Sequence, residues 1–196
     1  MKTDSAIQIE DISFFPLNIS RWVDFEMLFG AHGASGGCWC MFWRLPRKQF
    51  QQNCANCGEA NRQALRALVQ GGLVPGLIGY RDQMPVAWCS IAPREDFSSL
   101  ERSRTLKRVD DRPVWSIVCF YIAKTERNSG CMLKAIQAAV EFARQGGAHL
   151  VEAYPTQVDR HHTPVELYMG SLETFLKAGF IKVAPCGAHW LVRFEI

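Results

Sequence analysis

The sequence predicts one mixed α/β or α+β domain, because candidate strands and amphipathic helices alternate along the whole chain. Its 196 residues are enough to build a single core. Apolar residues make up 48% and charged residues 21%, which is ordinary usage for a globular protein. The chain contains no repeat, linker or low-complexity tract, so we expect a single domain over residues 1–196.

The expected strands are short apolar runs bounded by turn residues. They lie at residues 7–14, 76–80, 85–91, 114–123, 149–153, 180–183 and 190–195. The run at 114–123 is the longest and most apolar, which is typical of a central strand buried on both faces. The expected helices have apolar residues at helical spacing or end at glycine. They cover residues 21–29, with Ser20 as N-cap, and residues 59–69, 131–145 and 165–177.

Charge and hydropathy exclude several classes of protein. The net charge of +3 is too small to predict a nucleic-acid-binding surface. No apolar run approaches the ~20 residues that span a bilayer, and residues 1–10 lack the pattern of a signal peptide. Without such a signal, the eight cysteines are expected to be free thiols. We therefore expect a cytoplasmic protein with no membrane and no nucleic-acid partner.

The junction between the central strand and the next helix carries the most informative chemistry. Gly130 stands in the turn before that helix, where successive backbone amides at the positive helix end favour an anion such as a pyrophosphate. Arg127 adds a positive charge and Ser129 a hydroxyl donor. An ordinary tight turn stays open as the alternative. The lysine of a P-loop and the three glycines of a dinucleotide fingerprint are missing, which disfavours nucleoside triphosphates and nicotinamides.

This turn resembles the acetyl-CoA loop of the GNAT superfamily of N-acetyltransferases, whose pattern is Gln/Arg-x-x-Gly-x-Gly/Ala. The matching residues are Arg127, Asn128, Ser129, Gly130, Cys131 and Met132. The residues Phe120, Tyr121 and Ile122 resemble the splayed central strand of that family, and residues 175–180 its closing Tyr-x-x-x-Gly-Phe motif. The resemblance covers roughly residues 73–196, and residues 1–72 would form an acceptor-side N-terminal part.

The resemblance implies a GNAT-like fold, with a mixed, mostly antiparallel central sheet of about six to seven strands flanked by helices. It implies an acetyl-CoA-dependent N-acetyltransferase that acts on a primary amine, expected to belong to a small molecule. Backbone groups from Phe120 through Tyr121 to Ile122 would run beside the pantetheine arm, and the amides from Asn128 to Met132 would hold the pyrophosphate. Direct attack in a ternary complex is expected, because no cysteine has an obvious histidine partner in the sequence.

Two residues depart from the family pattern, and they leave the acid and the base of the reaction open. Met132 replaces a small residue beside the phosphates, and Phe175 stands where the family often has a tyrosine that protonates the departing thiolate. Tyr168 is the preferred replacement acid, with Ser171 as a second candidate, but a tyrosine that anchors the loop before the helix is the stronger alternative for Tyr168. Glu152 is the best-placed candidate base, unless it faces solvent or pairs with a lysine.

The aromatic segment after the first helix is expected to border the acceptor site, and the polar segment 92–112 would form a second wall. Aromatic rings could enclose an apolar or cationic acceptor, and acidic residues could attract an amine. Simple core packing is the alternative for the rings. The candidate substrate-binding residues are Trp39, Phe42, Trp43, Glu95 and Asp96.

Four cysteines, Cys38, Cys40, Cys54 and Cys57, have spacings that leave three interpretations open. They could hold a tetrahedral zinc ion, carry out redox chemistry, or line the core or pocket; we expect no metal. The function likewise has two alternatives, a non-catalytic acyl-CoA sensor or scaffold and a zinc- or thiol-based regulatory module. The sequence leaves open whether the protein is a monomer or a homodimer.

Overall fold

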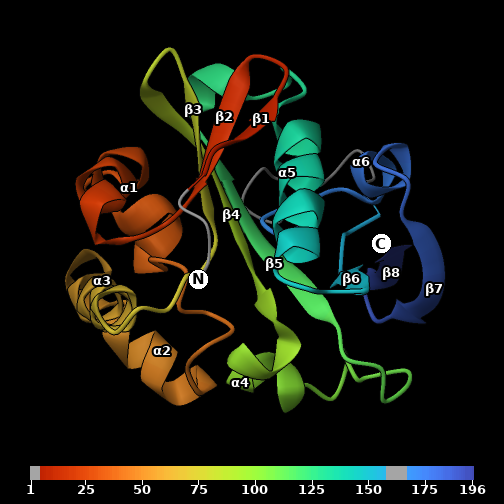
Figure 1. Cartoon of the computed structure of the whole chain (residues 1–196). Coiled ribbons are helices and arrows are strands. Elements are labelled where there is room, and N and C mark those ends of the chain that lie inside the picture. Colours follow the sequence, from red (N-terminus) through yellow and green to blue (C-terminus); the bar gives the residue numbers. More distant parts are fainter. Residues whose placement is uncertain (1–4, 158–166) are drawn as a thin grey trace.

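The computed structural model describes residues 5–157 and 167–196 of the chain. A single eight-stranded sheet crosses the molecule and is covered by helices (Figure 1). The strand order is β1-β2-β3-β4-β5-β6-β8-β7. The strands are β1 (Ile7–Ile9), β2 (Ile12–Pro16), β3 (Leu77–Arg81), β4 (Met84–Pro93), β5 (Trp115–Ile122), β6 (Leu150–Ala153), β7 (Ile181–Cys186) and β8 (His189–Glu195). The predicted fold class is confirmed, with eight strands in place of six or seven.

Six of the seven neighbouring strand pairs are antiparallel, and only β5 and β6 run parallel. Parallel neighbours need a crossover connection. Helix α5 (Cys131–Gln145) supplies it, with the bounds that the sequence predicts.

The two faces of the sheet carry separate cores, because side chains alternate along each strand. On β5, Phe120 and Ile122 pack in the cluster with α5 and α6 (Leu172–Lys177). Cys119 and Tyr121 pack in the opposite cluster, which includes α1 (Trp22–Phe29), α2 (Arg47–Asn53) and α3 (Ala55–Gln70). Figure 1 shows α5 and α6 on one side of the central strands and α1–α3 on the other. The central strand is buried on both faces, as expected.

The N-terminal part differs from its prediction in three places. The expected first strand is a hairpin of β1 and β2, with Glu10 in a left-handed conformation at the turn. Asn18, instead of Ser20, caps the turn before α1, because its side chain accepts from the amides of Ser20 and Arg21. Helix α2 was not predicted, since its polar sequence buries only Phe50.

The C-terminal helix is shorter than its prediction over 165–177. Residues 165 and 166 lie outside the described part of the chain. Residues 167–171 are not helical, because Ser171 has an extended backbone and accepts a hydrogen bond from the Thr174 amide as the N-cap of α6. A short helix, α4 (Ser98–Glu101), interrupts the polar segment between β4 and β5.

Candidate functional site

A gap opens in the sheet where β5 and β6 part. The parallel pairing runs from Trp115 to Ile117 on β5 and ends there. Ala123 donates its amide to the Val86 carbonyl of β4 at 2.9 Å, so Phe120 and Ile122 carry their backbone groups on the opposite edge, toward the gap. The Phe120 amide is engaged there, because it donates to the Tyr168 carbonyl at 2.7 Å.

The turn between β5 and α5 is an open cradle of backbone amides. Asn128 and Gly130 have left-handed backbones, with φ of 63° and 80°, and Gly130 is the N-cap of α5. A Cβ atom added to Gly130 would meet no heavy atom within 4 Å. The first amides of a helix have no partner within it, and Gly130 before them is exposed. The geometry is that of an anion site at a helix N-terminus.

The side chains around this cradle divide their roles. Arg127 is exposed, and its Nε donates to the Ile122 carbonyl at 3.4 Å, which holds it beside the turn. Ser129 Oγ donates to the Glu126 carbonyl at 2.7 Å, so its hydroxyl supports the turn. Glu126 is in turn paired with Arg81 at 2.7 Å. The amides and Arg127 are therefore the groups available to an anion.

Cys131 and Met132 follow the cradle and turn toward the core. Cys131 is buried, and burial raises the pKa of its thiol to about 11, so it is a packing residue. Met132 packs against the cluster under α5. The core under α5 therefore holds the Met132 side chain. We expect this larger residue, which replaces the small residue of the family pattern, to leave the backbone amides accessible.

Glu152, the candidate base, lies in a buried ion network. Its Oε1 is 2.8 Å from Arg94 Nη1, and its Oε2 is 2.9 Å from the Arg193 guanidinium. The Tyr154 hydroxyl also donates to Oε1. Only 1% of Glu152 is exposed. Both carboxylate oxygens are thus held by guanidinium groups, and these contacts favour a structural role.

The candidate acids differ in their surroundings. Tyr168 is half-buried beside the gap, and burial raises the pKa of its phenol, which keeps it protonated as a proton donor. Ser171 Oγ lies 2.7 Å from Thr174 Oγ1 and serves the helix cap. Phe175 is fully buried against Phe120 and Phe180, at ring distances of 6.0 and 5.0 Å. Phe175 is thus part of the core.

The structure brings two of the predicted acceptor-side aromatics to Tyr168. The ring of Phe42 lies 5.7 Å from that of Tyr168 and 4.9 Å from that of Trp43. Trp39 does not join them, because its ring stacks on Phe29 at 5.7 Å, and its Nε1 donates to the Cys57 carbonyl at 2.8 Å.

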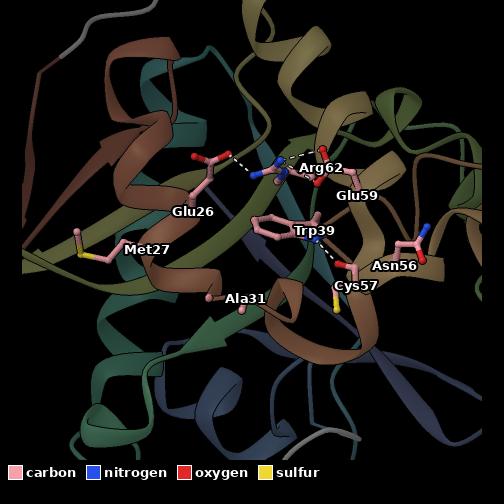
Figure 2. Close-up of a pocket in the computed structure, with 9 residues that line it drawn as sticks. Glu26, Met27, Ala31, Trp39, Asn56, Cys57, Glu59 and Arg62 are labelled. Carbon is pink, nitrogen blue, oxygen red and sulfur yellow. Dashed lines mark hydrogen bonds and ion pairs between the residues drawn. The ribbon is translucent and has the colours of Figure 1, made fainter.

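Trp39 instead lines a separate hollow of about 340 Å³ between α1 and the start of α3 (Figure 2). Figure 2 shows Arg62 bridging Glu26 and Glu59 across the same hollow, at 3.1 and 2.8 Å. These charges are mutually satisfied. The residues that line this hollow include neither Tyr168 nor any residue of β5 or β6.

The acidic candidates Glu95 and Asp96 are exposed, and Glu95 is paired with Arg108 at 2.7 Å. Asp96 offers its carbonyl to Arg44 Nη1 at 3.3 Å. Arg44 is itself buried over the Phe97 ring, and its Nε and Nη2 have no hydrogen-bond partner. Burial lowers the pKa of this guanidinium to about 10, against the smaller opposing effect of Asp96.

The four cysteines considered for zinc make separate contacts. Cys54 accepts from Asn61 Nδ2 at 3.7 Å, and Cys57 lies 3.7 Å from His32 Nδ1. Cys40 instead approaches Cys119 at 3.7 Å. Among the residues that the structure describes, no group of three or more His, Cys, Asp or Glu side chains is arranged to hold a metal ion.

Comparison with protein families places residues 39–170 in the acetyltransferase (GNAT) family. That match covers more than half of the chain. The chain belongs to the GNAT family. The family resemblance and the predicted enzyme class, an acyltransferase that uses acetyl-CoA as cosubstrate, are thereby confirmed. A search of curated protein sequences gives no match.

Solved structures share the fold of this GNAT domain. The PaiA N-acetyltransferase from Thermoplasma acidophilum, solved with coenzyme A, has a TM-score of 0.52 and 10% identity, over 94% of this chain and 99% of that one. A GNAT-family acetyltransferase from Streptococcus agalactiae has a TM-score of 0.56 and 11% identity, over 97% and 98%. The ribosomal-protein-S5-alanine acetyltransferase from Vibrio fischeri has a TM-score of 0.53 and 12% identity, over 98% and 97%.

Two features of this GNAT domain escape prediction from its sequence. Arg94, fully buried, joins the polar segment to β6 through Glu152 and donates to the Leu106 carbonyl at 2.7 Å. Cys119 meets Cys40 from a distant part of the chain. The sequence carries no local signal for either contact. Within the described residues, no helix is both long and apolar enough to cross a membrane.

Proposed function

We propose that this GNAT enzyme transfers the acetyl group of acetyl-CoA to a primary amine of a small molecule, by direct attack in a ternary complex. One observation carries the proposal. The left-handed Gly130 opens the N-terminus of α5 to solvent, directly after the point where β5 leaves β6. An amide cradle next to a gap in the sheet suits a pyrophosphate followed by an extended arm.

The residues fit the cosubstrate at three points. The amides from Asn128 to Met132 would hold the pyrophosphate, with the Arg127 charge at its edge. The Ile122 amide would pair with the pantetheine arm, since the Ile122 carbonyl already accepts from Arg127. Tyr168 already engages the Phe120 amide, so this tyrosine would lie beside the arm. The PaiA N-acetyltransferase, which shares the fold, was solved with coenzyme A, and this supports the proposal.

Acetyl-CoA supplies an activated thioester, and the chain has to orient the amine and handle two protons. The amine nitrogen forms a bond to the acetyl carbon while the carbon–sulfur bond breaks. The Tyr168 phenol gives its proton to the departing thiolate, and water in the gap carries the proton that the amine loses back to the phenolate. Ser171 is the second candidate donor.

A small acceptor is favoured by the residues beside Tyr168. Phe42 and Trp43 form an aromatic corner with it, and such rings suit a compact apolar or cationic group. Asp96 lies exposed on the neighbouring segment and would attract an ammonium group, whereas Glu95 is paired with Arg108. Trp39 is left out of this corner, because its ring is committed to the Phe29 stack.

A second candidate, a non-catalytic acyl-CoA sensor, is favoured by two specific observations. Phe175 stands in the core where the family often has its acid, and Glu152 is held by two arginines. A protein of this kind would keep the cradle and lack turnover.

Binding is tested first by thermal unfolding with acetyl-CoA, with adenosine as the control. Acetyl-CoA should raise the unfolding midpoint and adenosine alone should not. If neither ligand shifts the midpoint, both the enzyme and the sensor are excluded.

Turnover is then tested with a panel of amines, aminoglycosides, polyamines and amino acids. Free CoA and acetylated product are measured by chromatography, because the eight protein thiols would react with thiol dyes. Product with one class of amine supports the enzyme. Intact mass after incubation with acetyl-CoA alone should show no acetylated protein, and a stable acetyl adduct on a cysteine would contradict direct attack.

A further inference from the structure

Three thiols form a chain from the loop after α1 to the central strand. Cys38 and Cys40 lie on that loop, two positions apart in the sequence. The Sγ atom of Cys40 is 3.7 Å from that of Cys119 on β5. Cys119 directly precedes Phe120, whose amide bonds to Tyr168. The chain of thiols therefore ends beside the gap of the candidate site.

Cys38 sits where its thiolate is stabilised. The loop around it bends through left-handed backbones at Gly36 and Gly37, and Trp39 and Cys40 also have positive φ. The Cys40 thiol and the backbone groups of Cys40, Ser35 and Cys38 itself lower the pKa of the Cys38 thiol to about 6. Burial opposes this shift and is outweighed by these groups. The thiol form donates to the Gly33 carbonyl at 3.6 Å.

Cys40 and Cys119 have the opposite character. Cys40 is buried, and burial raises the pKa of its thiol well above the ordinary value. It stays a thiol and donates to Cys119 Sγ. Cys119 is half-buried on β5. A disulfide needs the two sulfurs at ~2.05 Å, so a small movement of either side chain from 3.7 Å suffices.

We propose that these residues form a thiol relay for hydroperoxides, in which Cys38 reacts with hydrogen peroxide and a disulfide between Cys40 and Cys119 results. The Cys38 thiolate attacks one peroxide oxygen, the O–O bond breaks, and hydroxide leaves; Cys38 is oxidised to a sulfenic acid and peroxide is reduced. The Cys40 thiol then attacks the Cys38 sulfur. An S–S bond forms, and the sulfenic oxygen leaves as water with the Cys40 proton.

Thiol–disulfide exchange completes the relay. The Cys119 thiolate attacks the Cys40 sulfur, and the Cys38 thiolate departs. Cys38 is the preferred leaving group, because a thiol of lower pKa leaves faster. The net reaction consumes one hydrogen peroxide and two thiols and gives one disulfide and two waters. The product ties the loop that carries Phe42 and Trp43 to β5.

The other cysteines provide internal controls. Cys57 is exposed and lies beside His32, but no second cysteine contact is described for it. Cys89 and Cys131 are buried, and burial raises the pKa of both thiols. Reactivity that followed exposure alone would select Cys57, whereas the relay selects Cys38.

The test is peptide mapping of the full chain after one equivalent of hydrogen peroxide and blocking of free thiols with N-ethylmaleimide. Trypsin leaves Cys38 and Cys40 together in the peptide 22–44, Cys119 in 109–124, and Cys54 and Cys57 in 49–62. We expect the peptides 22–44 and 109–124 to be joined by a disulfide, located by fragmentation at Cys40, that dithiothreitol reverses.

Three variants sharpen the assignment. Cys38→Ser should slow the cross-link at least about tenfold, because the reactive thiolate is lost. Cys119→Ala should remove the cross-link and stop the oxidation at a Cys38–Cys40 disulfide. Cys57→Ser should change nothing. The relay is overturned if the native chain gives no cross-link between the two peptides, if Cys57 is oxidised first, or if Cys38→Ser cross-links as fast as the native chain.

Discussion

The proposed cofactor loop (residues 127–132) and the proposed acceptor wall (residues 38–45) are built in opposite ways. The cofactor loop is one continuous turn whose useful groups are backbone amides, set by the left-handed Asn128 and Gly130. The acceptor wall acts through side chains, and these meet partners from remote segments, such as Tyr168 and Cys119.

This difference separates the positions on which cofactor binding should depend from those on which acceptor choice should depend. A backbone cradle tolerates most side-chain changes around it, as Met132 illustrates by turning into the core. The acceptor wall changes with each ring or thiol that the tertiary structure brings to it. Cofactor binding should therefore depend on few positions, and acceptor choice and regulation on several distant ones.

The largest expected effect comes from a charge placed in the cradle. Gly130→Glu should weaken acetyl-CoA binding about 1000-fold, because two like charges ~4 Å apart repel by about 4 kcal/mol near a protein surface. Calorimetric titration with acetyl-CoA measures the loss. Gly147→Glu is the matched control, because Gly147 has the same φ of 80° and the same open surroundings at the other end of α5. Equal affinities for the two variants would remove the anion site from residues 127–132.

The buried ion network gives the next effect. Glu152→Gln should destabilise the fold by about 3 kcal/mol, because two buried guanidinium groups lose their counter-charge. Urea unfolding measures this change. Glu173→Gln, which alters an exposed carboxylate paired with Lys177 at 2.8 Å, should leave the unfolding midpoint unchanged. A Glu152→Gln protein of native stability that had lost only turnover would instead restore Glu152 as the base.

A change of the candidate proton donor should affect turnover and leave cofactor binding unaffected. Tyr168→Phe should lower kcat about 100-fold and leave acetyl-CoA affinity unchanged, because general acids contribute at least that factor to the transition state. Steady-state kinetics with the best amine of the panel measures it. Tyr80→Phe is the control, since its hydroxyl bonds to Asp24 at 2.7 Å near α1. Equal kinetics for Tyr168→Phe and the native chain would return Tyr168 to a packing role.

The smallest effect is a pH dependence in the acceptor wall. Alkylation of Cys38 by iodoacetamide should rise with pH and reach half its maximum near pH 6, because only the thiolate reacts and it is populated above its pKa of about 6. Mass spectrometry of the peptide 22–44 follows the rate. Cys131 should stay unlabelled over this range, since burial raises its pKa to about 11. A Cys38 rate that kept rising above pH 8 would contradict the stabilised thiolate.

Elements with strong local signals were predictable. Helix α5 has the predicted bounds, because its apolar stripe and the glycines at both ends lie in one segment. The hairpin of β3 and β4 follows in the same way from alternating runs around a turn. Helix α2 escaped prediction, because it buries only Phe50 and is polar elsewhere. The C-terminal helix is shorter than its prediction, because Ser171 has an extended backbone and is the N-cap of α6.

The turn before α5, to which we assign the cofactor, follows from the sequence alone, because a glycine turn before an amphipathic helix is made of neighbours in the chain. The contacts of Glu152 and of the thiols follow from the tertiary structure. Glu152 and Arg94 are separated by 58 residues, and Cys40 and Cys119 by 79. Such contacts depend on sheet register and on how the loops pack over it, and no local pattern encodes which distant side chain will meet which.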